Sequence, residues 1–355
     1  MLNYIIRRLL LMFPTVIGIT LLVFAVMFYS PGGVGGSLLD NAGDMRPEDR
    51  KAREAYLEQR FGINRPFFVQ YGKWLNNVSP VGLKEAGGGF PRSAGFGFKW
   101  PDLGRSFVRE RQVTSMIADA LPTTLALNLI TVPVIYTIAV TAGLFTATRR
   151  GRFADVSLGV VFIGLWSLPV MWMGVMLIGF LANRDFLALF PTGGLTSAEA
   201  YAWSFFPGDG HKGWLLDRLW HLAGPVICLT YGGFAFLSKL TRASVLENMT
   251  ADYVRTARSK GLNERVILYR HVLRNSILPL ITVASGIIPG LLGGSVIVES
   301  IFSLDGMGKV TLDAITVRDR EVVLSMTLVS AIIGTTCLLI SDVCYVLADP
   351  RVSYD

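Results

Sequence analysis

The chain has 355 residues and a formal net charge of +7, and 52% of its residues are hydrophobic whereas only 17% are charged. Soluble proteins carry roughly 25% charged residues, so this chain has too few charges to cover a soluble surface, and it is too apolar to be disordered. Cys228, Cys337 and Cys344 lie in apolar runs without metal-site or disulfide spacing. The composition predicts a membrane protein, in which positive charge reports orientation rather than nucleic-acid binding.

Apolar runs long enough to cross a bilayer recur along the chain, since a helix needs about 20 residues to span about 30 Å of hydrocarbon. The six candidates are 9–30, 121–147, 156–182, 219–238, 277–298 and 322–346. None has the polar stripe of a soluble helix, so we expect an all-α, polytopic membrane protein with six transmembrane helices. The first run is longer than the apolar core of a typical signal peptide, which favours a retained helix.

Lysine and arginine in the short connecting segments predict the orientation. Arg7 and Arg8, three arginines in the 148–155 turn and eight Lys or Arg in the 239–276 loop would lie in the cytoplasm, with both termini inside. A sizeable extracytoplasmic segment then separates the first two spans. The chain divides into a tail with the first span (1–30), the extracytoplasmic segment (31–120), and a core of five spans that contains the 239–276 loop (121–355).

The extracytoplasmic segment has its own local signals. A helix is expected from Pro47 to Gly62, because the acids that follow Pro47 suit the positive end of a helix dipole. A second, amphipathic helix is expected over Phe67, Phe68, Tyr71 and Trp74. The glycine-rich stretch 86–98 predicts a flexible loop and is not a phosphate loop, because no Gly-Lys-Ser/Thr follows it.

The cytoplasmic stretch 252–279 predicts two short helices around a break. The first would end at Lys260 with Gly261 as a left-handed stop, and Asn263 would cap the second. In the second helix we expect one shared face made of Val266, Tyr269, Val272 and Leu273. Such an apolar stripe edged by arginines suits a basic loop on anionic lipid or a docking element for a soluble partner, and the residues alone leave both open.

This stretch resembles the cytoplasmic coupling motif of ABC importer permeases of the oligopeptide/dipeptide/nickel branch. The matching residues are Thr256-Ala257-Arg258-Ser259-Lys260-Gly261-Leu262, His271, Arg274-Asn275 and Leu278-Pro279. Arg255 and Thr256 replace the first residues of the broader Glu-Ala-Ala form, so the acidic contact of other branches is not carried over. Further pieces resemble the branch in the right order, among them FPTGGL (190–195), VESIFSLDGMG (298–308), AITVRDREVV (314–323) and DPRVSYD (349–355).

The resemblance implies a permease subunit of an ATP-driven importer, which forms half of the translocation pathway for peptides or similar small solutes. It implies a bacterial inner-membrane protein that works with a second homologous permease, two ABC ATPase subunits and an extracytoplasmic substrate-binding protein, in lipid and without nucleic acid. The chain would be no enzyme, with no catalytic, metal or cofactor site. ATP and Mg would be used by the partner subunits.

Three groups of residues are assigned roles on this basis. ATPase coupling is expected of Tyr253, Ala257, Arg258, Gly261, Leu262 and Arg265. The turn-forming stretch after the fifth run is expected to act as a gate or binding-protein contact rather than as an ordinary connector, through Asp305, Gly306 and Gly308. The pathway candidates, each of which would serve equally as a packing residue, are Asn128, Tyr136, Trp166 and Trp172.

His221 and Asp342 are the ionisable residues within the six runs. Each is a candidate proton relay, but each lies near the end of its run, which favours an interfacial role. The competing class is an ion-coupled secondary transporter, which calls for mid-membrane charges and repeat-related broken helices that the sequence does not display. A scaffold without transport would leave the docking loop unexplained. The sequence does not distinguish peptide, nickel chelate, oligosaccharide or peptide antibiotic as cargo, or reveal a role for residues 78–101.

Overall fold

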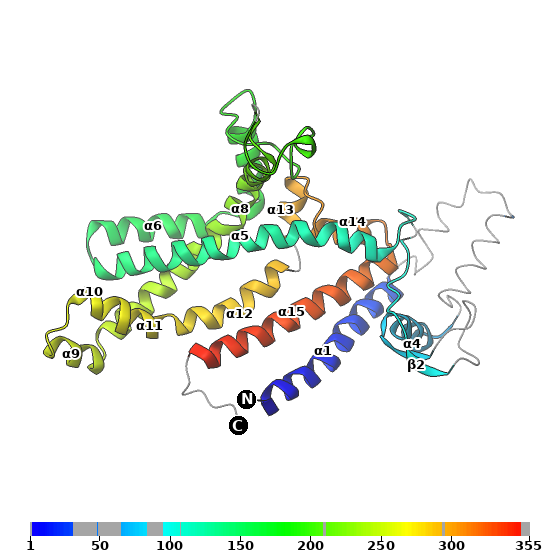
Figure 1. Cartoon of the computed structure of the whole chain (residues 1–355), viewed down its shortest axis with the longest axis horizontal. Coiled ribbons are helices and arrows are strands. Elements are labelled where there is room, and N and C mark those ends of the chain that lie inside the picture. The colour runs from blue at the N-terminus through cyan, green and yellow to red at the C-terminus, as the bar shows by residue number, and fades with distance from the viewer. Residues whose placement is uncertain are drawn as a thin grey trace. The chain divides into compact units, whose positions relative to one another are not determined.

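The computed structural model describes residues 2–30, 48, 65–83, 95–106, 108–208, 211–292 and 295–348. Within these ranges the chain is mostly helical, from α1 (Leu2–Tyr29) to α15 (Arg320–Ala348) (Figure 1). The all-α class is confirmed in this coarse form. Apart from residue 48, the helix expected from Pro47 to Gly62 lies outside the described residues.

Several described helices are long and apolar enough to cross a bilayer. Four pass on their own: Tyr4–Tyr29 within α1, Val113–Thr148 (α5), Trp214–Met249 (α8) and Arg320–Val343 within α15. A fifth candidate is a bent pair, described below. The run predicted at 277–298 contains α12 (Leu278–Leu292), which has 15 residues and is followed by two residues outside the described ranges. The count of six spans therefore stays a prediction.

The run predicted at 156–182 is helical but broken. Helix α6 (Phe153–Ser167) and the segment Val170–Ala182, which comprises α7 (Val170–Met176) and a π-helical turn, meet at an angle of 95°. Pro169 has no backbone N–H and pushes Leu168 into an extended conformation, which ends α6. The Tyr231 hydroxyl donates a hydrogen bond of 2.6 Å to the Leu168 carbonyl, so α8 supplies a partner at the break.

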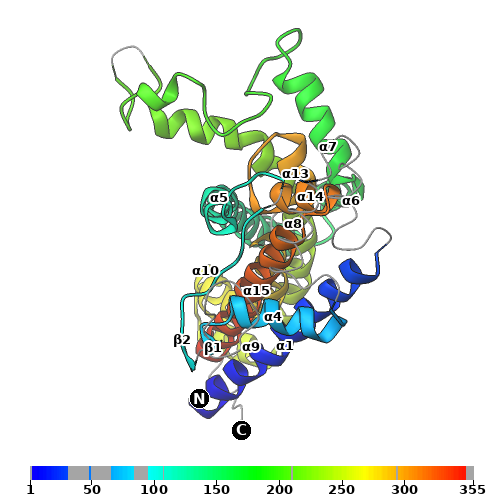
Figure 2. The ribbon, with the colours of Figure 1, turned by 90° about the vertical axis from the view of Figure 1, so that its right-hand side faces the viewer.

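Contacts divide the chain into two compact units, one of residues 1–8, 120–309 and 333–355 and the other of residues 9–119 and 310–332. The second unit is built around α4 (Phe67–Val78), which runs across α1 (Figure 2). Its apolar face packs Tyr71 and Trp74 against Phe24 and Leu324. The Tyr71 hydroxyl lies 2.9 Å from the Thr20 hydroxyl. The predicted amphipathic helix is thus confirmed, although Phe68 is on its exposed side.

A short β-hairpin follows α4. Strands β1 (Val81–Leu83) and β2 (Phe96–Phe98) pair antiparallel, with Val81 opposite Phe98. The Asn76 side chain holds Leu83 through two hydrogen bonds, accepting from its N–H at 2.9 Å and donating to its carbonyl at 3.1 Å. The prediction of a flexible loop over 86–98 is therefore wrong for its last three residues, where backbone pairing outweighs the glycine content. Residues 84–94 lie outside the described ranges.

The first unit is organised around α5 and α8. At Gly143 of α5 an added Cβ would lie 2.5 Å from the Thr241 Cβ, so glycine is what lets the two helices approach. Ile135, Leu237 and Leu280 belong to a buried cluster of this unit. Its remaining elements are the 3₁₀ turn Ala200–Ala202, α9 (Asp252–Ser259), α10 (Glu264–Val266), a π-helical turn (Ile267–Val272), α11 (Leu273–Ser276) and α13 (Val296–Ile301). Helix α14 (Met307–Thr316) continues from this unit into the second.

Candidate functional site

The coupling stretch predicted at 252–279 begins where the sequence indicated, but the helix before it is longer than the run predicted at 219–238. Helix α8 does not stop at residue 238 but continues to Met249, because its extension carries good helix formers and buries Val245. Helix α9 starts at Asp252, directly after Ala251 in an extended conformation. The segment predicted as a loop at 239–276 is therefore a helix extension followed by a compact element over residues 252–276, which we call the coupling element.

The break inside the coupling element matches the prediction. Gly261 has φ of +75°, a left-handed conformation that favours glycine, and it ends α9. The Asn263 side chain accepts a hydrogen bond of 2.9 Å from the Arg265 N–H and so caps α10. Across the break, Arg258 Nε lies 2.7 Å from a Glu264 carboxylate oxygen. Hydrogen bonding to this guanidinium lowers the pKa of the Glu264 carboxyl below its ordinary value.

One face of the coupling element is buried against the ends of α5 and α8. Val254, Ala257, Ile267 and Val272 pack with Leu144, Ala147 and Val245 in one apolar cluster. The single face expected for Val266, Tyr269, Val272 and Leu273 is not formed, because Val266 and Tyr269 are exposed whereas Val272 is buried. The cause is the π-helical turn at Ile267–Val272, which changes the periodicity of the second helix so that Ile267 is buried instead.

The other face of the coupling element is open. Of the six residues predicted to couple to an ATPase, Ala257 is buried, whereas Tyr253, Arg258, Gly261, Leu262 and Arg265 are exposed. Tyr253 is held in place by a hydrogen bond of 2.7 Å from its hydroxyl to the Asn248 side chain. The structure thus separates the residues that anchor this segment from those on its open face, and the coupling role of the six residues stays a prediction.

An ion pair that the sequence analysis missed ties α6 to α8 beside this element. The Arg242 guanidinium donates two hydrogen bonds to the Asp155 carboxylate, of 2.7 and 2.8 Å, and Asp155 also accepts from the Gly151 N–H at 3.0 Å. Asp155 is 6% exposed. The available signal was an acid at the start of one apolar run and an arginine just after another, but nothing local pairs two residues so far apart in the sequence.

We predict that Asp155→Ala lowers the stability of the protein by about 2 kcal/mol, because it leaves the half-buried Arg242 without its hydrogen-bond partner. A shift of several degrees in the apparent melting temperature in detergent measures this. The matched control is Asp119→Ala, which breaks the exposed Arg111–Asp119 pair and is expected to cost under about 1 kcal/mol. Equal shifts in the two variants would contradict a structural role for the buried pair.

The predicted gate is organised by a residue that the sequence analysis did not single out. The Glu299 carboxylate is completely buried and accepts hydrogen bonds from the Thr124 hydroxyl at 3.2 Å and from the Lys309 N–H at 2.9 Å. The Thr124 hydroxyl in turn accepts from the Met307 N–H at 2.9 Å. The turn at 302–308 is therefore wrapped around one carboxylate at the start of α14, where a negative charge suits the helix dipole.

The two glycines of this turn are required by the close approach of Glu299. An added Cβ at Gly306 would lie 2.5 Å from the Glu299 carboxylate, and one at Gly308 would lie 2.7 Å from the Val296 nitrogen. Asp305 points away from this packing: it is exposed and pairs with Lys309 at 2.9 Å. Of the three predicted gate residues, the glycines shape the turn and Asp305 presents a charge on its surface.

The comparisons with known proteins agree on one family. The family described as binding-protein-dependent transport system inner membrane component matches residues 139–354, and its N-terminal counterpart matches residues 1–128. The chain belongs to this family. It is a multi-pass inner-membrane permease component of a transport system and not a catalytic subunit. Of the two transporter classes considered from the sequence, the family match therefore supports the ABC importer permease and not the ion-coupled secondary transporter.

Relatives match this permease over nearly its whole length. The oligopeptide transport system permease protein AppB of Bacillus subtilis is 35% identical over 356 residues, which cover 99% of each chain. The peptidoglycan transport system permease protein YejB of Agrobacterium fabrum is 30% identical, covering 99% of this chain and 98% of its own. Among solved structures, an inward-facing MetNI methionine ABC transporter chain covers 66% of this permease at 15% identity, with a TM-score of 0.48.

The four pathway candidates of the permease are not brought together. The buried Asn128 side chain donates to the Thr124 carbonyl at 2.7 Å, and the Tyr136 hydroxyl donates to the Leu280 carbonyl at 3.0 Å, so both serve helix packing. Trp166 and Trp172 are exposed on either side of the break between α6 and α7. Trp166 and Trp172 are therefore surface aromatics, and the contacts of the four residues do not define a common site.

The two ionisable residues within the predicted spans have partners near helix ends. His221 Nδ1 lies 2.9 Å from the Asp217 carbonyl, and the Asp217 carboxylate accepts from the Ser197 N–H at 2.7 Å. Asp342 pairs with Arg8 at 3.1 Å. Both arrangements fit the interfacial role that the sequence favoured over a proton relay.

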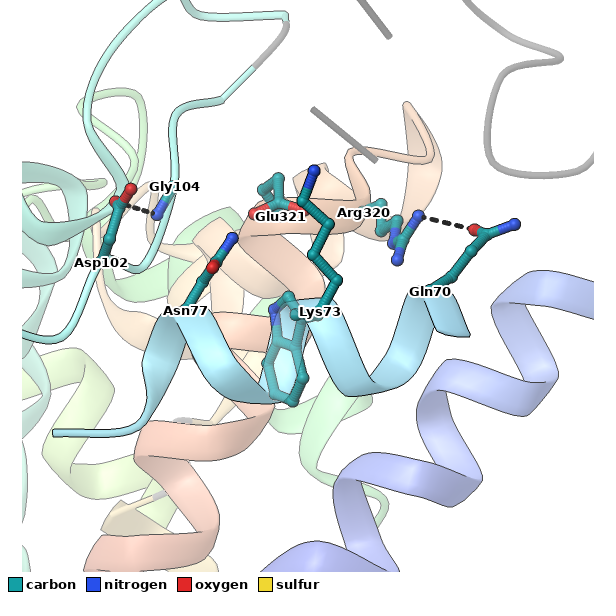
Figure 3. A pocket seen from close by; sticks show the side chains of 8 residues that line it. Gln70, Lys73, Asn77, Asp102, Gly104, Arg320 and Glu321 are labelled. Carbon is teal, nitrogen blue, oxygen red and sulfur yellow. Dashed lines mark hydrogen bonds between the residues drawn. The ribbon is translucent and has the colours of Figure 1, made fainter. Parts of the chain in front are cut away.

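A narrow polar pocket lies in the second unit, between α4, the segment after β2 and the start of α15 (Figure 3). The buried Arg320 side chain donates to the Gln70 side chain at 3.3 Å and lies 4.6 Å from the Phe24 ring centre. The buried Trp74 indole nitrogen has no hydrogen-bond partner within the described ranges. With about 10 Å³ of free space the pocket holds about one water and is too small for a transported solute. Its polar lining joins α4 to α15 through the Arg320–Gln70 hydrogen bond.

Proposed function

We propose that this permease is a subunit of an ATP-driven importer and that residues 252–276 receive the motion of a partner ATPase. The observation that carries the proposal is the two-sidedness of the coupling element. Its inner face is clamped into the ends of α5 and α8, and its outer face leaves Tyr253, Leu262 and Arg265 exposed. An element with one face packed on α5 and α8 and the other face exposed is suited to transmit the movement of a bound partner to these two helices.

The proposed partners follow from the same arrangement and from the family. Two ABC ATPase subunits would contact the coupling elements of this permease and of a second homologous permease, and would bind the ATP and Mg that this chain does not. An extracytoplasmic binding protein would deliver the solute to the opposite side, where the gate residues Asp305, Gly306 and Gly308 are placed by the predicted orientation. Each permease would then form half of the pathway.

Peptides are the proposed cargo class. Relatives that match this chain from end to end carry names for oligopeptide, dipeptide and peptidoglycan transport. Mass spectrometry of the ligand retained by the cognate binding protein tests this. Recovery of short peptides supports the proposal, and recovery of a metal chelate or an oligosaccharide overturns it.

Contact with an ATPase is tested by disulfide or short-linker crosslinking in membranes. A Leu262→Cys variant is expected to crosslink to a nucleotide-binding subunit, because its side chain lies on the open face of the coupling element. Leu219→Cys, which is similarly exposed but lies at the other end of α8, is the matched control and is expected not to react with that subunit. Equal crosslinking of both, or of neither, would argue against docking at residues 252–276.

The proposed orientation places both termini and the coupling element in the cytoplasm and residues 31–120 outside. We predict that, in a variant with the native cysteines replaced by serine, Phe90→Cys reacts with an impermeant maleimide on intact cells and Lys260→Cys does not. The physical reason is the excess of Lys and Arg in the short segments on the inner side. Permeabilised cells, in which both positions react, provide the control, and the opposite pattern would reverse the topology.

A further inference from the structure

A groove with a free volume of about 330 Å³ lies between α5, α6 and α8, beside the coupling element. It is lined by one residue near the end of α5, four on α6 and three on α8: Thr146, Asp155, Val156, Gly159, Phe162, Ser238, Lys239 and Arg242. None of these residues has a role in the function proposed above. The groove has a charged end and an apolar floor, and these two parts would favour different chemical groups of a ligand.

The charged end carries a net positive charge. The two hydrogen bonds from Arg242 to Asp155 neutralise that pair and leave Nη1 of the guanidinium outside it. Lys239 is exposed, one helical turn away, and no carboxylate in the described part of the chain pairs with its ammonium. The turn that joins α5 to α6 adds Arg149, Arg150 and Arg152 nearby. An anionic group therefore finds favourable charge at this end.

The floor of the groove is apolar and open. Val156, Gly159 and Phe162 recur along the face of α6 that looks into the groove, and nothing lies within 4 Å of the position where a Cβ of Gly159 would be. The neighbouring α6 side chains Val160 and Ile163 are exposed, as expected of a helix that meets acyl chains. A free anion such as phosphate would use only the charged end, whereas a phospholipid would fill both.

We propose that this groove binds an anionic phospholipid, with the headgroup phosphate at Lys239 and Arg242 and the glycerol and first acyl carbons over Gly159. The lipid would lie against α5 and α8, which anchor the coupling element, and against α6, at the Asp155–Arg242 pair. The alternative occupant, a helix of a second permease subunit, would have to bring an acidic side chain into the membrane to meet Lys239, which is the costlier arrangement.

The test is lipid binding to the purified transporter complex, measured by native mass spectrometry in detergent without nucleotide. Dioleoylphosphatidylglycerol is titrated against dioleoylphosphatidylcholine, and the expected result is preferential retention of the anionic lipid. Lys239→Gln is expected to weaken that binding about fivefold, since one cationic side chain near an anionic lipid surface is worth about 1 kcal/mol. Gly159→Leu, which fills the groove without removing charge, is expected to weaken it at least tenfold.

Two matched variants control for general effects. Gly164→Leu adds the same side chain to α6 at a glycine that also has open space but does not line the groove, and Lys212→Gln removes a lysine remote from it in the sequence. Both are expected to bind the anionic lipid as the wild type does. Equal retention of the two lipids, or unchanged binding in both Lys239→Gln and Gly159→Leu, overturns the proposal. The proposal is also overturned if a Gly159→Cys variant crosslinks to the second permease and position 159 is not labelled by a photoactivatable phosphatidylglycerol. Because no ATPase step is measured, failure here leaves the proposed coupling function untouched.

Discussion

Replacing Gly306 and Gly308 together by valine is expected to abolish uptake at normal expression. The two positions have no room for a side chain, since a Cβ at Gly306 would meet the buried Glu299 carboxylate and one at Gly308 would meet the backbone of Val296. Valine would push the turn off the carboxylate that organises it and separate Glu299 from the Lys309 N–H. Solute uptake in cells, with expression followed by immunoblot, is the measurement.

The comparison for this prediction is a deletion of residues 86–94, which leaves β2 and its pairing with β1 in place. Glycine-rich stretches contribute little packing, so the deletion is expected to weaken uptake only mildly. If the double valine variant transports normally and the deletion variant does not, the assignment of the gate to the turn at 302–308 is wrong. A Glu299→Gln variant separates shape from charge, because the amide keeps the volume of the side chain but lacks the negative charge at the start of α14.

Gly261→Pro and Gly261→Leu are both expected to uncouple transport from ATP hydrolysis while the protein still inserts and assembles. Gly261 has φ of +75°, which proline cannot adopt and which costs leucine about 1–2 kcal/mol. Either residue would tilt α10 relative to α9 and shift the exposed face of the coupling element. Uptake and ATPase rate in the reconstituted complex are measured together, and the expected result is hydrolysis without uptake.

Two variants make the uncoupling test specific. Gly151→Leu introduces the same conformational strain, since Gly151 also has φ of +75°, but in the turn between α5 and α6 rather than in the coupling element. It is expected to lower stability without changing the ratio of uptake to hydrolysis. Gly261→Asn is expected to retain coupling, because asparagine tolerates the left-handed conformation. Full uptake by the leucine and proline variants would refute the lever role of residues 252–276.

What the sequence predicted well is what depends on neighbouring residues. The stop at Gly261 and the cap at Asn263 are local: a positive φ and a side chain that accepts from the Arg265 N–H are decided within a few positions. The amphipathic helix at Phe67–Val78 is local in the same sense, because its period places Tyr71 and Trp74 on one face.

What the sequence did not predict depends on residues far apart in the chain. Glu299 becomes the centre of the gate turn only because Thr124 is brought beside it, and Asp155 is buried only because Arg242 reaches it from α8. The separation of the exposed Val266 and Tyr269 from the buried Val272 has a different cause, a π-helical turn that a period of 3.6 residues does not describe. The break at Pro169 had a visible signal, but a proline inside an apolar run does not state whether the helix bends or ends.

Helix α8 has a thermodynamic consequence. With 36 residues it is about 54 Å long, well beyond the roughly 30 Å of hydrocarbon, so in the proposed orientation this one helix would reach water on both sides of the membrane. At one end it holds Ser197 through Asp217, and at the other it anchors Val254 through the apolar cluster. If binding at the coupling element changes the affinity for a partner at the other end of α8, then that partner changes the affinity at the coupling element by the same free energy. In the proposed complex, the binding protein on the extracytoplasmic side is therefore expected to change the affinity of the ATPase for nucleotide by the same factor as nucleotide changes the affinity for the binding protein.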